Sequence, residues 1–153
     1  ITTRLVGSEM CIRDSRSRLE ISLENYSKAI RIEALAMLDM LFKDILPAAA
    51  LYTADLTAAA KSKKELGIAG SFEAELASKI ATLSSLLYTD AEKLKAGLGD
   101  VVKTSAQAEA DYYHDVILKD MGALREAGDE LEKLMGGKYL PYPTYSELLF
   151  GVY

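Results

Sequence analysis

The stretch LENYSKAIRIEALAMLDMLFKDILPA, residues 23–48, decides the fold of this chain. Its apolar side chains recur at steps of three and four residues, which places them on one face of an α-helix. These residues are Leu23, Tyr26, Ile30, Ala34, Met37, Leu41 and Ile45. A second stripe beside the first consists of Leu35, Leu38, Phe42 and Leu46. A helix that is apolar over so wide an arc is predicted to be covered on two sides.

We expect this first helix to begin near Leu19 and to end at about Ser62. Pro47 removes one backbone donor and crowds the carbonyl four residues earlier, so a kink is predicted there. A clean break into two helices is the alternative. Gly67 is expected to stop the helix. Before it, the negative helix end is complemented by Lys61, Lys63 and Lys64.

A second helix is predicted after Ser71, which is a plausible N-cap. Its apolar residues are spaced close to a heptad repeat, and Gly97 and Gly99 are expected to end it. The seam consists of Phe72, Leu76, Ile80, Leu83, Leu87, Ala91, Leu94 and Leu98. Lys93 is expected on the exposed side of this helix.

A third helix is predicted to begin between Asp100 and Thr104, because Thr104 and Gln107 have the spacing of a capping box. Gly136 and Gly137 are expected to terminate it. Its buried face is predicted to contain Ala106, Ala110, Tyr113, Ile117, Met121, Leu124, Leu131 and Leu134.

These patterns predict an all-α fold, an antiparallel three-helix bundle over residues 17–137 with a long, Pro-kinked first helix. Short connections and matched lengths make the second and third helices a hairpin. The part of the first helix before Pro47 would then project as an apolar arm, which implies a surface missing from this chain.

The last segment, KYLPYPTYSELLFG at residues 138–151, has a different pattern. Pro141 and Pro143 hold the chain extended, and Thr144 with Glu147 has capping-box spacing. We therefore expect residues 138–153 to form an extended docking tail that ends in one short helical turn carrying Leu148, Leu149 and Phe150.

The first 16 residues are expected to be a non-native or disordered leader. The segment VGSEMCIRDS, residues 6–15, resembles the peptide produced when a sequencing-library adaptor is translated in frame. It contains the only cysteine, Cys11. If the segment is foreign, the native part has no thiol for disulfides or thiolate metal sites, which suits a cytoplasmic protein.

The composition narrows the class of protein. Of the 153 residues, 50% are hydrophobic and 27% charged, and the formal net charge is −5, which describes an acidic globular chain. An acidic balance argues against a nucleic-acid partner, and no apolar run is long enough to predict a membrane span.

The sequence contains no recognisable catalytic motif. His114 is the only histidine; it shares a face with Asp111 but is read as a solvated surface residue. Neither glycine-rich phosphate loop occurs. We therefore predict no catalytic, cofactor-binding or metal-binding residue. Surface ion pairs are expected between Asp39 and Lys43, and between Lys133 and both Asp129 and Glu130. Three tyrosines are predicted to pack in the core, namely Tyr26, Tyr52 and Tyr113.

The first helix and the tail together resemble the C-terminal helical region of type III glutamine synthetases. The shared patterns are YSK-x-I-x-IEA-x-x-M-x-D-M with a following I-L-P-A, and P-x-PTY-x-x-LLF, and the resemblance runs from about Ser17 to Val152. It implies an enzyme that uses ATP and magnesium or manganese to join ammonia to glutamate, with its metal ligands in an upstream catalytic domain. It also implies that this fragment alone is inactive and that the intact enzyme is a homo-oligomer.

The residues predicted to contact a partner are the apolar ones that a bundle would leave uncovered. They are Leu35, Leu38, Phe42, Tyr142, Tyr145, Leu149 and Phe150. The alternative is a stand-alone helical protein-interaction module without enzymatic activity, which would show the same periodicities.

Overall fold

The structure is a computed structural model that describes residues 3–68, 72–101, 104–143 and 145–151, with side chains described from Ile12 onward except at 145–146. Within these ranges it is all-helical and contains no strand. The elements in chain order are α1 (Thr3–Met40), η1 (Leu41–Ile45), α2 (Leu46–Glu65), α3 (Phe72–Gly99), α4 (Ala106–Tyr112), η2 (Tyr113–Ile117), α5 (Leu118–Leu134), η3 (Gly137–Tyr139) and α6 (Tyr145–Phe150).

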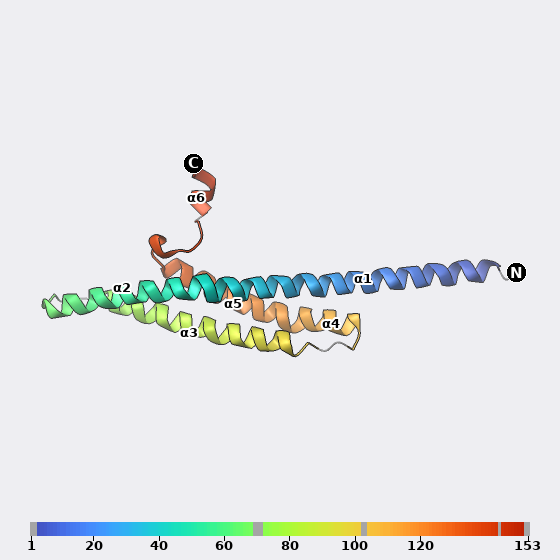
Figure 1. The fold of residues 1–153 in the computed structure, drawn as a ribbon, viewed down its shortest axis with the longest axis horizontal. Helices are drawn as coiled ribbons and strands as arrows, with labels where there is room; N and C mark the ends of the chain where they lie inside the picture. The colour runs from blue at the N-terminus through green and yellow to red at the C-terminus, as the bar shows by residue number, and fades with distance from the viewer. Residues whose placement is uncertain (1–2, 69–71, 102–103, 144, 152–153) are drawn as a thin grey trace.

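The helices are arranged as long rods that lie side by side (Figure 1). The first rod is α1, η1 and α2 in succession, and α3 packs on α2. The rod made of α4, η2 and α5 packs on both α3 and α1. The short helix α6 stands away from all of them (Figure 1).

The first helix begins at Thr3, so the predicted start near Leu19 is wrong. The predicted projection before Pro47 is also too long. Ser27 and Ala34 of α1 are already buried, against α4 and η2, whereas the described side chains of residues 12–22 are all exposed. The helix therefore projects only as far as about residue 22. The foreign origin of residues 6–15 remains a prediction.

A π-helical turn, rather than a kink at Pro47, adjusts the first rod. The N–H of Leu46 donates to the carbonyl of Leu41, five residues earlier, and Figure 1 shows no sharp bend between α1 and α2. Fully buried residues recur every seven positions from Ser27 through Ala34 to Leu41, then after eight at Ala49 and after seven at Leu56. The π turn holds one extra residue per turn, and this absorbs the extra step so that one face stays buried.

The first rod ends at Gly67 as predicted. Gly67 has φ of 71°, a left-handed conformation that glycine adopts without steric cost. Its N–H donates to the carbonyl of Lys64 (3.1 Å) and that of Ile68 donates to Lys63 (3.0 Å), which is a Schellman cap. The predicted N-cap Ser71 lies outside the described residues.

The start of the third rod is shifted by one residue from the prediction. Ser105, not Thr104, is the N-cap, since its side chain accepts a hydrogen bond from the N–H of Ala108 at 3.1 Å. The rod ends at Leu134, just before the predicted stop at Gly136.

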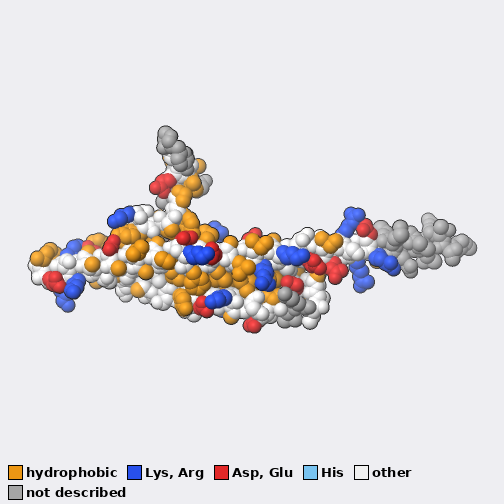
Figure 2. Space-filling model, in the orientation of Figure 1, with side chains coloured by type: hydrophobic (Ala, Val, Ile, Leu, Met, Phe, Trp, Pro, Cys, Tyr) orange, Lys and Arg blue, Asp and Glu red, His pale blue; other side chains and the backbone are white. Residues whose placement is uncertain are grey.

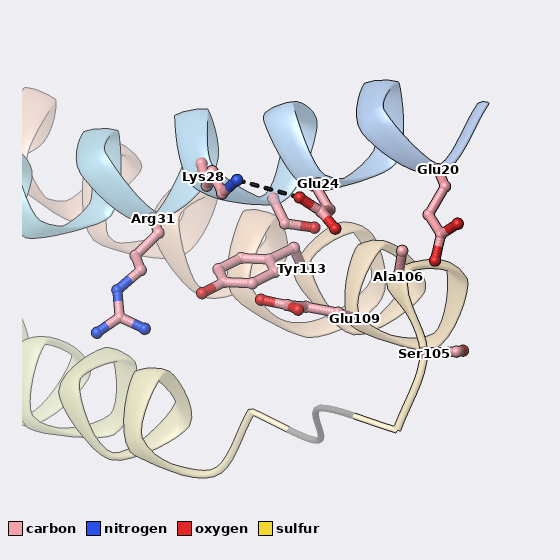
Figure 3. A pocket seen from close by; sticks show the side chains of 9 residues that line it. Glu20, Glu24, Lys28, Arg31, Ser105, Ala106, Glu109 and Tyr113 are labelled. Carbon is pink, nitrogen blue, oxygen red and sulfur yellow. Dashed lines mark hydrogen bonds and ion pairs between the residues drawn. The ribbon is translucent and has the colours of Figure 1, made fainter. Parts of the chain in front are cut away.

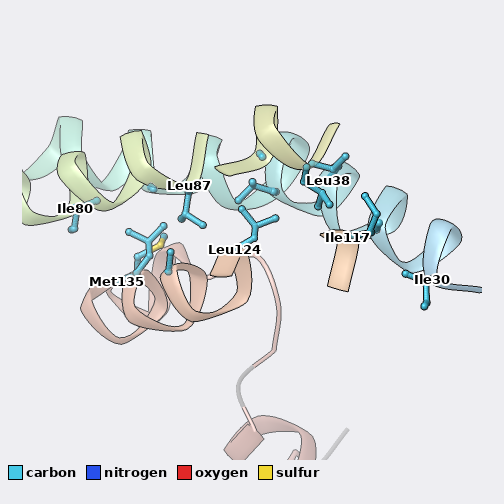
Figure 4. Close-up of a cluster of buried hydrophobic side chains, with 14 of the residues drawn as sticks. Ile30, Leu38, Ile80, Leu87, Ile117, Leu124 and Met135 are labelled. Carbon is cyan, nitrogen blue, oxygen red and sulfur yellow. The ribbon is translucent and has the colours of Figure 1, made fainter. Parts of the chain in front are cut away.

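The core runs along the line where the three rods meet (Figure 4). Figure 4 shows Leu38, Leu87 and Leu124 converging from α1, α3 and α5. Most of the predicted core positions are buried or half-buried. Three are exposed, namely Phe72 at the start of α3 (66%), Tyr26 of α1 (38%) and Leu35 in the second stripe of α1 (48%).

Two carboxylates are also buried, and a lysine partners each of them. Lys93 contacts Asp120 at 2.6 Å between α3 and α5, and Lys63 contacts Glu73 where α2 approaches α3. The hydrogen bond with Asp120 raises the pKa of Lys93 above its usual value. Lys93 is exposed, as expected, with 68% of its side chain accessible, and it also links two helices.

Candidate functional site: the anchored tail

The tail begins at Met135, where the third rod ends, and it contacts the first rod within its first few residues. The ring of Tyr139 lies on the ring of Tyr52 with centroids 4.6 Å apart, and the hydroxyl of Tyr139 donates to the carboxylate of Asp55. The ammonium of Lys138 lies 5.1 Å from the same Tyr139 ring. Aromatic contact and a charge-assisted hydrogen bond thus hold η3 against α2.

A second anchor follows three residues later. The hydroxyl of Tyr142 donates to the carboxylate of Asp44, which lies in the π turn η1. This hydrogen bond raises the pKa of Tyr142 to about 12, and the bond to Asp55 likewise raises the pKa of Tyr139. Both tyrosines therefore keep the proton that they donate throughout the neutral range. We call these four residues, Tyr139, Asp55, Tyr142 and Asp44, the tail anchor.

Beyond the anchor, α6 presents apolar side chains to solvent. Leu148 is 62% exposed, Leu149 58% and Phe150 79%. Figure 2 shows apolar side chains on this stalk, clear of the body of the molecule. Adjacent exposed leucine and phenylalanine side chains are typical of a surface that contacts another chain or domain.

The structure separates the predicted contact residues into three groups. Leu35 on α1 and the α6 residues Leu149 and Phe150 are exposed, and Tyr142 is 36% exposed although it is anchored. Leu38 is 7% exposed and belongs to the chain's own core, which corrects its assignment as a contact residue. The remaining two are Phe42, half-buried with its ring 6.0 Å from that of Tyr88, and Tyr145, whose side chain lies outside the described part.

An open groove of about 370 Å³ lies between α1 and the start of α4 (Figure 3). Glu20, Glu24 and Glu109 line it, with Lys28 held 3.2 Å from Glu24. Two buried hydroxyls at its edge, those of Ser27 and Tyr113, have no hydrogen-bond partner among the described residues. Protein atoms cover both hydroxyls, so a ligand in the groove could not reach them, and the groove is not a built binding site.

The described residues contain no group of three or more His, Cys, Asp or Glu side chains that could hold a metal ion. His114 contacts its neighbour Asp115 at 3.1 Å, whereas Asp111, which was expected to share a face with it, accepts from Gln107 at 2.8 Å. The side chain of His114 is exposed, as expected. Two of the predicted surface ion pairs form, Asp39 with Lys43 at 2.5 Å and Glu130 with Lys133 at 2.6 Å. In the described part of the chain, no helix is long and apolar enough to cross a membrane.

From the sequence, Tyr142 and the α6 residues were expected to contact a partner, which stays a prediction, and the tail anchor was missed. Tyr139 pairs with Asp55 across 84 positions and Tyr142 with Asp44 across 98. In the sequence, each acceptor looks like an ordinary carboxylate on the surface of a helix. No local pattern marks such pairs, because they depend on the arrangement of the rods.

The comparisons of this chain with known proteins all point to one family. Residues 8–64 match the family described as glutamine synthetase C-terminal domain. A glutamine synthetase of Butyrivibrio fibrisolvens is 39% identical over 146 residues, covering 89% of this chain and 20% of that protein. The type-3 glutamine synthetase of Dictyostelium discoideum is 26% identical over 142 residues, covering 88% and 19%. The chain thus spans about a fifth of the length of these curated relatives, and no solved structure matches it.

Proposed function

We propose that this chain, which carries the C-terminal region of a type III glutamine synthetase, supplies that enzyme with a packing and assembly surface and with none of its catalytic groups. The observation that carries the proposal is that α6 exposes apolar side chains while the tail anchor holds the chain that leads to it. Leu149 and Phe150 are exposed, while the chain that leads to them is hydrogen-bonded to Asp44 and Asp55.

The complete enzyme would ligate ammonia to glutamate with ATP and magnesium or manganese. The residues described here do not fit a role in holding those groups, because no metal-binding cluster is found among them. Several of their carboxylates are instead engaged by lysines, as at Asp39, Asp120 and Glu130. The phosphoryl-transfer chemistry would therefore lie in the part of the relatives that this chain does not span.

The partner proposed for the tail is a second copy of the same enzyme, and the partner proposed for the exposed apolar residues of α1 is the upstream catalytic domain. Leu35 is 48% exposed and Ile32 is 67% exposed on neighbouring turns of α1. We also propose that the three rods pack as one antiparallel bundle and that the protein is cytoplasmic.

Truncation of the intact enzyme after Gly137, followed by light scattering on a sizing column, tests the assembly role. We expect smaller assemblies than those of the parent. A finer test replaces Leu149 and Phe150 by serine, and its matched control replaces Leu66, which is 77% exposed at the far end of α2. A truncated enzyme that still forms full-size, active assemblies would contradict the proposal.

A further inference from the structure

We propose that Tyr139 and Tyr142 are positioning residues, which fix the direction in which α6 presents its apolar face by hydrogen-bonding to Asp55 and Asp44. This inference rests on the proposed function and deepens it, because it names what holds the assembly surface in place.

The two acceptors lie on one rod and act as two separate points. Asp44 belongs to η1 and Asp55 to α2, eleven residues further on. At about 1.5 Å of rise per residue they are roughly 16 Å apart along the rod. One attachment point leaves a segment free to swivel, whereas two separated points fix both its position and its direction.

Prolines restrict the backbone on both sides of Tyr142. Pro141 and Pro143 flank Tyr142, and a proline both fixes its own φ and holds the preceding residue extended. Leu140 shows the effect, with φ of −67° and ψ of 125°. Holding the Tyr142 ring in place therefore restricts the path of the chain toward α6.

The first anchor point is reinforced by a second aromatic ring, and its tyrosine is the less exposed of the two. Tyr139 contacts both the Tyr52 ring and the Lys138 ammonium, and it is half-buried. Tyr142 has Asp44 as its hydrogen-bond partner and is 36% exposed. Loss of the Tyr142 hydroxyl should consequently free α6 more than loss of the Tyr139 hydroxyl.

The test is a distance measurement in the whole chain by pulsed electron paramagnetic resonance. One spin label is placed on α6 through Leu149→Cys and one on the exposed side of α3 through Ala81→Cys, with Cys11→Ser removing the native thiol. The parent should give one narrow distance peak. The variant with Tyr139→Phe and Tyr142→Phe should lose that peak and give a broad distribution, while its helical circular dichroism signal and cooperative melting show that the rods are still folded.

The matched control is Tyr88→Phe, which removes a hydroxyl from a ring that is 54% exposed and packs edge-on against Phe42. It should leave the peak narrow. A narrow peak in the double variant, or a broad one in the parent, would overturn the proposal. If the double variant does not fold, Tyr142→Phe and Asp44→Asn decide the question singly by the same criterion. A lost peak combined with full-size assemblies of the truncated intact enzyme would support the anchor and reject the assembly role.

Discussion

The hydroxyl of Tyr142 donates a hydrogen bond to the carboxylate of Asp44, 98 residues earlier in the chain. The contact joins the end of the chain to the π turn in its first rod. It also places a phenol, whose pKa is raised, against a carboxylate. Deprotonation of Tyr142 would set two negative charges against each other, so the bond holds only while the phenol is neutral.

This arrangement predicts a loss of stability at high pH. The pKa of Tyr142 is raised from 10.0 to about 12 in the folded chain. The stability that it contributes is therefore fully present below pH 10 and is lost as the pH rises toward 12. We expect the melting temperature of the parent to fall over this interval more steeply than that of Tyr142→Phe.

Ultraviolet titration of tyrosinate absorbance checks the same point directly. The difference between the parent and Tyr142→Phe should show one late-titrating tyrosine. Tyr88→Phe is the control, and its difference from the parent isolates a tyrosine outside the anchor. If Tyr142→Phe removed a tyrosine that ionises no later than the others, the hydrogen bond to Asp44 would not form in solution.

Two adjacent leucines of α3 should respond very differently to truncation. Leu87 is completely buried and Leu86 is 48% exposed. Leu87→Ala should lower the free energy of unfolding by about 2–5 kcal/mol, because it leaves a cavity in the core. Leu86→Ala should change it by less than about 0.5 kcal/mol. Chemical denaturation of both variants measures the difference, and equal losses would mean that the faces of α3 are assigned wrongly.

The link between α3 and α5 provides a third prediction. Lys93→Ala removes the partner of Asp120, a carboxylate that is only 9% exposed, and should lower the melting temperature. Lys95→Ala on the same helix disrupts only a surface pair with Glu92 and should have little effect.

Adding Asp120→Asn to Lys93→Ala should restore part of the lost stability, since it neutralises the unpaired charge. Thermal melting of the single and double variants provides the measurement. A double variant that melts below Lys93→Ala would show that the charge of Asp120 is not the source of the loss.

Helices and core faces could be predicted here because they depend on local periodicity. The three- and four-residue steps that include Ile30, Ala34 and Leu41 require only neighbours along one helix. The same steps could not reveal how the first rod crosses Pro47. The buried positions Leu41 and Ala49 are eight residues apart instead of seven. The sequence alone does not show whether the helix breaks there, whereas the packing of the facing helices shows that the same side of the rod stays buried.

The candidate site was predictable only where its residues are unusual by themselves. Exposed leucine and phenylalanine after two prolines indicate a contact surface in any sequence. Asp44 and Asp55 do not stand out in this way, because a carboxylate on a helix is ordinary until a distant tyrosine is placed beside it. The length of the projecting arm was overestimated for a similar reason. Part of α1 is covered by α4, which lies far along the chain and cannot be placed there from a local pattern.

Two glycines should respond in opposite directions to the same substitution. Gly67 has a positive φ, so Gly67→Ala should cost about 1–2 kcal/mol of stability although space for the methyl group is available. Gly122 lies within α5 with nothing near its Cβ position, so Gly122→Ala should stabilise the chain by about 0.5–1 kcal/mol. Denaturant titration of the two variants tests the signs. A stabilising Gly67→Ala would show that α2 does not end in the left-handed cap.

Deleting residues 1–16 should leave the melting temperature unchanged while reducing the helical circular dichroism signal. Residues 3–16 of the deleted segment are helical, but the described side chains, from residue 12 onward, are all exposed and so contribute no burial to the core. A projecting helix end without tertiary contacts adds little to stability. Ile30→Ala, at a residue that is 5% exposed, is the positive control and should cost about 2–5 kcal/mol. If the deletion lowered the melting temperature by several degrees, as the Ile30 variant should, the leader would have to pack against the fold, and its interpretation as a foreign segment would fail.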